Sequence, residues 1–313
     1  CSASAFIAIN SRPNFTSEKA NIFLWRTGYY MKYGLGKGLD GYSFCRADDH
    51  YLRLCYNSVQ SNTICLAWQK AFGIEPATMG IALTVLTLLI IFGGIHRVAK
   101  FSSTVVPVMA VIYLLIAVGV VVWNITSLPK VLFTIVENAF GFNQAAGGVL
   151  GVTVIQGIKR GLFSNEAGEG SAPNAAAVAT VSHPVKQGLI QALGVFTDTL
   201  VVCSCTAFII LVSGVDLTAS NGIQLTQDAL THEIGSIGNP FVAVMIWLFA
   251  FSSIIGNYYY GETNVRYIRD SKLGVFVYRL AVAAMVMVGA VVSLDFAWSF
   301  ADITMLFSPS AIS

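Results

Sequence analysis

Charged residues are scarce in this chain. Asp, Glu, Lys and Arg make up 11% of its 313 residues, whereas they make up about a quarter of a soluble domain. Hydrophobic residues make up 55%, and the mean hydropathy is +0.69. A soluble core cannot bury so much apolar surface, so the lipid bilayer is predicted to be the solvent for most of the chain.

Other absences narrow the class of protein further. The net charge is only +2 and the basic residues form no cluster, which argues against a nucleic-acid partner. The six cysteines show neither the paired spacing of a metal site nor a disulfide framework. The chain begins at Cys1 rather than at Met, and it has no basic-then-apolar signal segment. We therefore interpret the sequence as a fragment of a longer protein.

Apolar runs define the predicted organisation. Residues 1–70 contain no run long enough to cross a bilayer, and residues 1–56 are expected to be irregular. A transmembrane helical core is predicted over residues 57–302, because a spanning helix needs about 20 apolar residues. Residues 303–313 are expected to be the truncated start of a further helix. The runs that predict this all-α, polytopic core are 78–95, 104–123, 147–163, 187–212, 241–260 and 275–296.

The connections between these runs alternate in charge. Residues 124–146 balance Lys130 against Glu137, and residues 215–239 carry three acidic residues and no Lys or Arg. This alternation follows the positive-inside rule, provided that the third run and the residues directly after it together cross the membrane once. The chain is therefore predicted to lie in a bacterial inner membrane with its basic connections in the cytoplasm. Those connections carry His96, Arg97, Lys100, His183, Lys186, Arg266, Arg269 and Lys272.

A polar turn, residues 164–170, interrupts the chain after the third run. One helix is predicted to end at Phe163, and an Ala-rich helix is predicted to restart at Ser171. Ser is a good N-cap, and Pro173 suits the first turn of the second helix. The glycines of the turn supply the backbone freedom that the break requires. The pattern is that of a membrane helix broken in the middle.

Such a break predicts a binding site. Unpaired backbone groups at membrane depth occur only where they line a cavity or are buried in protein. The two half-helix ends then direct their dipoles at one place, where one end suits a carboxylate and the other suits a cation. The alternative is an ordinary loop between two short helices, with Glu166 and Glu169 in water. The charge alternation argues against that loop, because basic residues would then face both sides of the membrane.

Several sequence blocks resemble one known family. The blocks RGLFSNEAGEGSAPNAAA, HPVKQGL and GVFTDTLVVCSCTAFIILVSG closely resemble the alanine-or-glycine:cation symporter family. Four other blocks are similar to it, namely GYYMKYGLGKGL, NSVQSN, FGGIHRVAK and FSSIIGNYYYGE. The similarity extends from about Asn57 to Asp302.

The resemblance implies a fold and a function. The fold would be part of a leucine-transporter-like inverted repeat, in which the broken helix is the discontinuous central helix. The function would be symport of a small neutral amino acid, chiefly alanine or glycine, with sodium as the co-transported ion. Transport would proceed by alternating access across the inner membrane, and the protein would not be an enzyme.

The resemblance also implies roles for particular residues. Phe163, Ser164, Asn165 and Gly168 would line the substrate pocket. Gln60 and Asn257 belong to neighbouring family blocks and would lie near this pocket.

The predicted sodium ligands are the hydroxyls of Ser252 and Ser253, which the resemblance assigns to the cation. By their spacing alone, two hydroxyls in a helix more often bond to the backbone of their own helix. Asp198 lies inside a predicted span, and an intramembrane carboxylate is by default a functional hypothesis. A structural Asp, partnered by Thr197 or Thr199, is the alternative interpretation.

The chain also departs from the family. The first broken core helix, with its Gly-Thr-Gly-Asn type of turn, is absent, and residues 40–56 are polar where the third core helix should begin. Many relatives have Trp at the position of Asn257. An incomplete, transport-inactive fragment therefore stays open as an alternative. A third possibility, an intramembrane hydrolase using Ser164 and His183, is disfavoured because no nucleophile-elbow pattern surrounds the serine.

Overall fold

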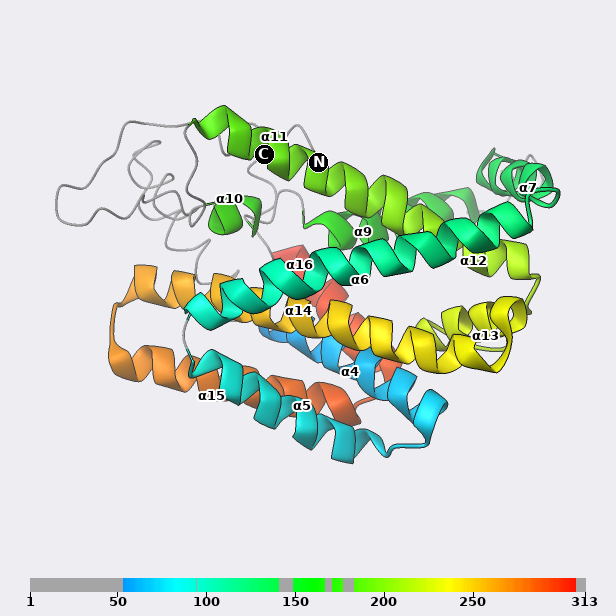
Figure 1. The fold of residues 1–313 in the computed structure, drawn as a ribbon. Helices are drawn as coiled ribbons and strands as arrows, with labels where there is room; N and C mark the ends of the chain where they lie inside the picture. The colour runs from blue at the N-terminus through cyan, green and yellow to red at the C-terminus, as the bar shows by residue number, and fades with distance from the viewer. Residues whose placement is uncertain (1–52, 94, 141–148, 167–170, 177–182, 308–313) are drawn as a thin grey trace.

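The computed structural model describes residues 53–93, 95–140, 149–166, 171–176 and 183–307 (Figure 1). Within these ranges the regular structure is helical throughout, and no strand occurs. The α-helices are α4 (Arg53–Phe72), α5 (Pro76–Ile91), α6 (Ile95–Trp123), α7 (Leu128–Phe140), α9 (Val149–Asn165), α10 (Ser171–Ala176), α11 (Pro184–Phe196), α12 (Cys203–Ser213), α13 (Ile223–Ile234), α14 (Gly238–Ile268), α15 (Lys272–Val291) and α16 (Leu294–Phe307). A π-helical turn, η2 (Thr197–Val202), joins α11 to α12, and a short 3₁₀ turn, η3 (Gly235–Ile237), joins α13 to α14.

The predicted membrane class is confirmed. Four described helical stretches are long and apolar enough to cross a bilayer: Val106–Trp123, Val185–Ser213, Ile223–Ile268 and Lys272–Val291. Each contains or overlaps one of the predicted runs. Helix α5 is also apolar but shorter, at 16 residues. The chain is therefore a multi-pass, helical membrane protein.

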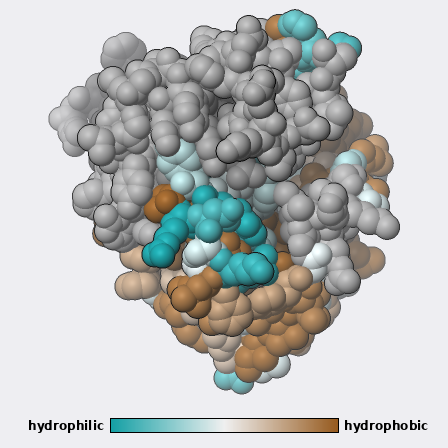
Figure 2. Space-filling model, turned by 90° about the vertical axis from the view of Figure 1, so that its left-hand side faces the viewer, coloured by the Kyte–Doolittle hydropathy of each residue, from teal (hydrophilic) through white to brown (hydrophobic). Residues whose placement is uncertain are grey.

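The basic connections gather at one end of the molecule. In Figure 1 the α5–α6 turn, the start of α11 and the α14–α15 turn lie at the left-hand end, and the α6–α7 and α12–α13 connections lie at the right-hand end. We call these the basic end and the α7 end. Figure 2 looks at the basic end, where hydrophilic residues gather above an apolar surface. At the α7 end, hydrogen bonds from Thr218 lower the pKa of Asp216, which keeps this exposed carboxylate charged. The arrangement agrees with the predicted alternation.

Helix α4 begins at Arg53, within the segment expected to be irregular, and lies in a part of the chain that has no long apolar run. From Arg53 onward the chain forms a 20-residue helix that packs between α14, α15 and α16. Counting apolar runs misses it, because its polar side chains are buried and bonded to protein rather than exposed to lipid. Ser61 Oγ donates to the Val286 carbonyl at 2.6 Å, and Asn62 Nδ2 donates to the carbonyls of Gly289 at 3.0 Å and Val292 at 2.7 Å.

The contact between α4 and α15 also depends on a glycine. A Cβ added to Gly289 would overlap the backbone of Ser58. Only a residue without a side chain therefore permits this close approach of the two helices.

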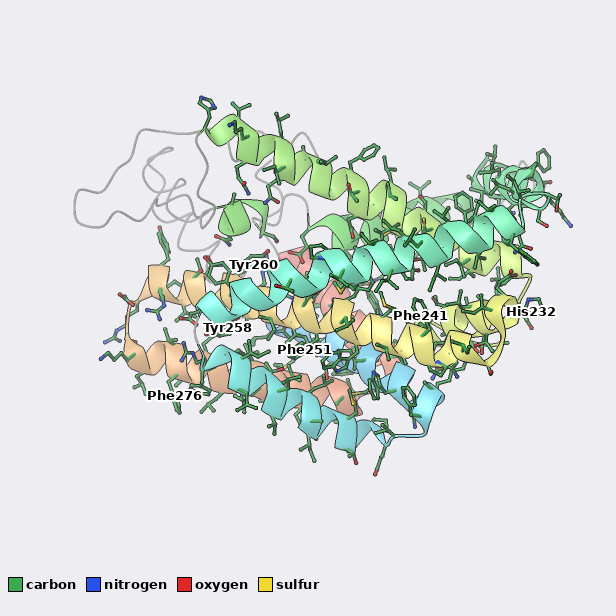
Figure 3. The ribbon with its side chains drawn as sticks, in the orientation of Figure 1. His232, Phe241, Phe251, Tyr258, Tyr260 and Phe276 are labelled. Carbon is green, nitrogen blue, oxygen red and sulfur yellow. The ribbon has the colours of Figure 1, made fainter. Side chains whose placement is uncertain are left out.

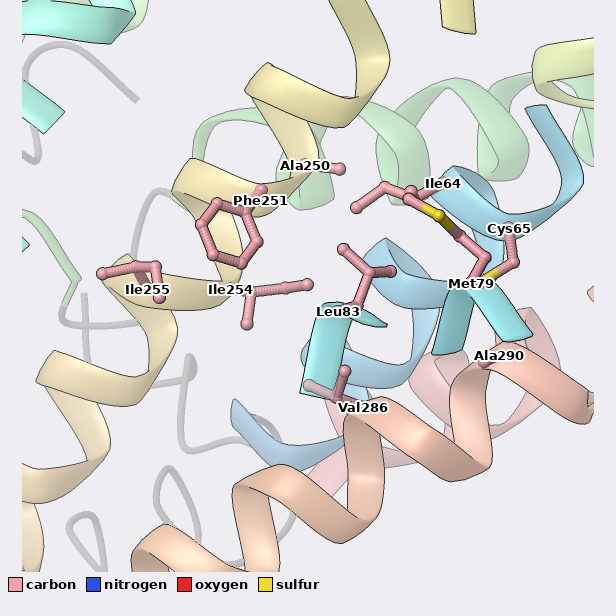
Figure 4. Packing of buried hydrophobic residues seen from close by; sticks show 10 residues of the cluster. All are labelled: Ile64, Cys65, Met79, Leu83, Ala250, Phe251, Ile254, Ile255, Val286 and Ala290. Carbon is pink, nitrogen blue, oxygen red and sulfur yellow. The ribbon is translucent and has the colours of Figure 1, made fainter. Parts of the chain in front are cut away.

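A hydrophobic cluster fills the space between α4, α5, α14 and α15 (Figure 4). Ile64, Leu83, Phe251 and Ile254 are each at most 1% exposed within it. This cluster, which we call the α4–α15 core, fixes one face of α14.

Two other features differ from the expectations. Helices α7 and α13 form where connections were expected, and α16 begins at Leu294 rather than near residue 302. The predicted run 275–296 in fact ends with α15, since Val292 is extended and Ser293 Oγ accepts a hydrogen bond from Phe296 N at 3.3 Å. A serine cap inside an apolar run separates two helices that hydropathy alone joins.

Candidate functional site

Two helices flank the predicted polar turn. Helix α9 ends at Asn165 and α10 begins at Ser171. Between them, Glu166 has a φ of +46°, a conformation that residues other than glycine seldom adopt. Gly168 lies outside the described residues, so its predicted role stays a prediction. The same holds for the side chain of Asn165, the last residue of α9.

A buried arginine ties the two sides of the break to the neighbouring helices. The Arg53 side chain is fully buried, and its Nη1 lies 2.8 Å from Glu166 Oε2. The same nitrogen donates to Asn257 Oδ1 at 3.2 Å, while Nη2 donates to Ser171 Oγ at 2.6 Å. The guanidinium also lies over the ring of Tyr260, 5.0 Å from its centroid.

This network bears on the loop alternative. A buried cation is tolerated when it is paired and hydrogen-bonded. The loop alternative places Glu166 in water, whereas in the structure Glu166 is the ion-pair partner of Arg53. Glu169 lies outside the described residues. Arg53 was not among the residues predicted from the sequence. The sequence signal that could have indicated it is a charged residue within the part of the chain assigned to the membrane, where charged side chains are usually functional.

Ser164 and Asp198 meet although 34 positions separate them. Ser164 Oγ donates to Asp198 Oδ2 at 2.7 Å and lies 3.3 Å from Cys203 Sγ. Asp198 belongs to the π-helical turn η2, and such turns interrupt α-helices often at functional sites. The last turn of α9 is thus bonded to an intramembrane carboxylate.

Asp198 also lines a cavity of about 690 Å³, which we call the α14 cavity. It is lined by residues of α6, α11, η2, α12, α13 and α14, and most of its lining is apolar. The polar side chains that line it include both predicted sodium ligands. They are Tyr113, Thr197, Asp198, Thr206, Thr226, Ser252 and Ser253.

The two predicted sodium ligands bond to their own helix. Ser252 Oγ donates to the Phe249 carbonyl at 2.7 Å, and Ser253 Oγ donates to the same carbonyl at 3.2 Å. These are the intrahelical bonds expected of serine in a helix. A hydroxyl that donates its hydrogen keeps two lone pairs, so both oxygens can still accept a bond or bind a cation. Among the described residues, no group of three or more His, Cys, Asp and Glu could hold a metal ion.

The remaining predicted residues lie elsewhere around the break. Phe163 packs between the rings of Tyr56 and Trp298, at centroid distances of 4.6 and 4.9 Å. Asn257 is 3% exposed and belongs to the Arg53 network. Tyr260, which lies against Arg53 in the same network, is closer to the basic end than Phe251 is (Figure 3). Gln60 is half-buried on α4. None of Phe163, Gln60 and Asn257 lines the α14 cavity.

Comparison with known proteins identifies a family. The model of the sodium:alanine symporter family matches residues 16–309. The probable sodium/glutamine symporter GlnT of Bacillus subtilis (strain 168) is 50% identical over 305 residues, which are 97% of this chain and 64% of GlnT. The amino-acid carrier protein AlsT of the same organism is 48% identical over 303 residues, 97% of this chain and 65% of AlsT.

A further relative is less similar to this chain. The sodium/alanine symporter AgcS of Methanococcus maripaludis is 36% identical over 253 residues, 79% of this chain and 55% of AgcS. The chain thus spans less than two thirds of the length of each of these three relatives.

Proposed function

Since the chain belongs to the sodium:alanine symporter family, a family of transporters and not of enzymes, we propose that it carries out sodium-coupled symport of a small neutral amino acid. Transport would proceed by alternating access across a bacterial inner membrane. The observation that carries this proposal is the joining of the break to the α14 cavity by the Ser164–Asp198 hydrogen bond.

We place the cation in the α14 cavity. Sodium is a hard cation that prefers oxygen ligands, and the cavity offers the Asp198 carboxylate and the hydroxyls of Ser252 and Ser253. A carboxylate in a low-dielectric site is costly unless a positive charge faces it. Bound sodium would supply that charge, and Ser164 would sense it through its bond to Asp198.

We place the amino acid at the break itself, beside Phe163, Ser164, Asn165 and Gly168. Alanine or glycine is the proposed substrate. The relatives are named for glutamine as well as for alanine, so the family accepts amino acids of different size. Asn257 lies beside the break in the Arg53 network. The side chain at position 257 is therefore the proposed determinant of substrate size. Cation and amino acid would each raise the affinity for the other, because coupling between two sites is reciprocal.

Uptake into proteoliposomes tests the proposal. The chain is reconstituted beside GlnT as a positive control, and radiolabelled alanine, glycine and glutamine are supplied in turn. We expect saturable uptake that requires sodium outside and is lost when choline replaces it. Equal uptake in sodium and choline would overturn the cation assignment. Uptake by GlnT but not by this chain would favour the transport-inactive fragment.

A further inference from the structure

Helix α7, which the proposed site does not use, has three different faces. Lys130, Thr134 and Glu137 recur at helical spacing and form a polar face. Val131, at 9% exposure, marks a second face, on which α7 packs against α12 and α9. The third face is apolar and exposed, and we call it the α7 apolar face. It consists of Leu132, Phe133 and Val136, at 46%, 67% and 56% exposure.

The length and charge of α7 prevent it from crossing the membrane. Its 13 residues extend over about 20 Å, whereas the hydrocarbon core of a bilayer is about 30 Å thick. A crossing would also place Lys130 and Glu137 in hydrocarbon, which is costly for charged side chains. A helix that cannot cross but has an exposed apolar face is suited to the membrane surface.

The position of α7 places it at the edge of the bilayer. The neighbouring span in α6 has exposed apolar side chains such as Leu115 and Val122 along its length, and it ends at Trp123, which is 86% exposed. A Trp at the end of a span is typical of the lipid–water interface. Helix α7 begins shortly after it, at Leu128. In Figure 1, α7 is seen nearly along its axis beside the end of α6, whereas α6 runs across the picture. Helix α7 therefore lies crosswise to α6 and does not continue it.

We propose that α7 is an interfacial helix, which binds the phospholipid surface at the α7 end. The α7 apolar face lies among the acyl chains, and Lys130, Thr134 and Glu137 point to water. The two charges of α7 are of opposite sign, so the attraction comes from apolar contact and not from the charge of the lipid headgroups. Phospholipid is the occupant that we favour, because the exposed apolar side chains of α6 lead along the chain to this face. Since α7 contacts both α9 and α12, it anchors these two helices at the level of the headgroups.

This inference does not rest on the proposed function, because a transport-inactive chain would place α7 in the same way. Its test uses the full chain with the six native cysteines replaced, reconstituted in phosphatidylcholine nanodiscs. A single new cysteine carries an environment-sensitive fluorophore. Val136→Cys reports on the α7 apolar face, and Thr134→Cys, which is also exposed, is the matched reporter on the polar face. Leu115→Cys, an exposed position in the span of α6, calibrates the depth in the bilayer.

The fluorophore is quenched either by iodide in the water or by lipids that carry a nitroxide. A shallow nitroxide lies roughly 5–10 Å below the headgroups, the depth to which interfacial helices bury their apolar face, and a deep one lies near the bilayer centre. We expect the shallow nitroxide to quench Val136→Cys at least about threefold more strongly than Thr134→Cys, and iodide to give the opposite order. Leu115→Cys should be quenched best by the deep nitroxide.

A charge on the α7 apolar face should weaken its binding to lipid. Leu132→Asp is expected to reduce the shallow quenching of Val136→Cys by about half or more, because a carboxylate is costly to bury among acyl chains. Thr134→Asp, which adds the same charge to the polar face, should leave that quenching unchanged. The comparison separates lipid contact from a general effect of charge on α7.

Three results would overturn the inference. Strong iodide quenching of both α7 reporters would place the whole helix in water. Strongest quenching of Val136→Cys by the deep nitroxide would place α7 among the spans. Shielding of Val136→Cys from iodide and from both lipids would show that protein covers this face, and cross-linking of two chains through that cysteine would identify a second copy as the occupant. If Val136→Cys does not fold, Phe133→Cys takes its place with the same expectations.

Discussion

The two faces of α14 are packed in opposite ways. Phe251 is fully buried in the α4–α15 core, whereas its neighbours Ser252 and Ser253 line the α14 cavity of about 690 Å³. One face of α14 is therefore packed in the hydrophobic core, and the other face lines the cavity. For the proposed alternating access, we expect the α4–α15 core to stay fixed and the elements around the break to move against it.

The largest effect should come from the core. Phe251→Ala removes a ring that is 0% exposed and is expected to lower the free energy of unfolding by about 3–5 kcal/mol. Phe249→Ala is the matched control on the cavity face of the same helix, and it should cost about half as much because that ring is only half-buried. Thermal unfolding in detergent measures both. Equal losses would remove the distinction between the two faces.

Removing the Arg53 side chain should have the next largest effect. Arg53→Met leaves Glu166 and Asn257 without their shared donor, and breaking a buried pair in this way costs about 3 kcal/mol. The double variant with Glu166→Gln should recover part of that loss, because it removes the unpaired charge. A double-mutant cycle on unfolding temperature gives the coupling; zero coupling would show that the pair does not hold the break.

Charge removal at Asp198 should act on the cation and leave the fold intact. In Asp198→Asn the new amide oxygen can still accept the hydrogen bond from Ser164. The lost charge is expected to weaken sodium binding about 10- to 100-fold. The measurement is the sodium concentration that gives half-maximal amino-acid uptake. An unchanged value would place the cation elsewhere.

Loss of a single cavity hydroxyl should have the smallest effect. Ser252→Ala removes a bond made within α14, so stability should change by less than about 0.5 kcal/mol. Sodium affinity should nevertheless fall a few-fold if the oxygen is a ligand, by about 1 kcal/mol at most. Thr226→Ala, elsewhere in the same cavity lining, is the control. If Ser252→Ala and Thr226→Ala lower the sodium affinity equally, Ser252 lines the cavity without binding the cation.

The sequence predicted the spans and the break better than the contacts. The length of an apolar run is a local property, so the central parts of α6, α12, α14 and α15 could be predicted from the sequence. Ser164 and Asp198 were each singled out, but their pairing depends on the π-turn η2 and on how α9 meets α11, which no local pattern encodes. Arg53 was missed, and α4 was expected only from the family resemblance, for a related reason: a polar helix enclosed by protein has no hydropathy signal. The Ser293 cap was hidden inside an apolar run.

The central claim, a sodium site at Asp198 in the α14 cavity, can be tested without transport. The unfolding temperature of the detergent-solubilised chain is measured in sodium chloride and in choline chloride of equal ionic strength. Because a ligand that binds only the folded state stabilises it, saturating sodium is predicted to raise that temperature by roughly 5 °C. The Asp198→Asn variant should show no such rise. A chain that unfolds at the same temperature in both salts, or a variant that keeps the full rise, would contradict the claim.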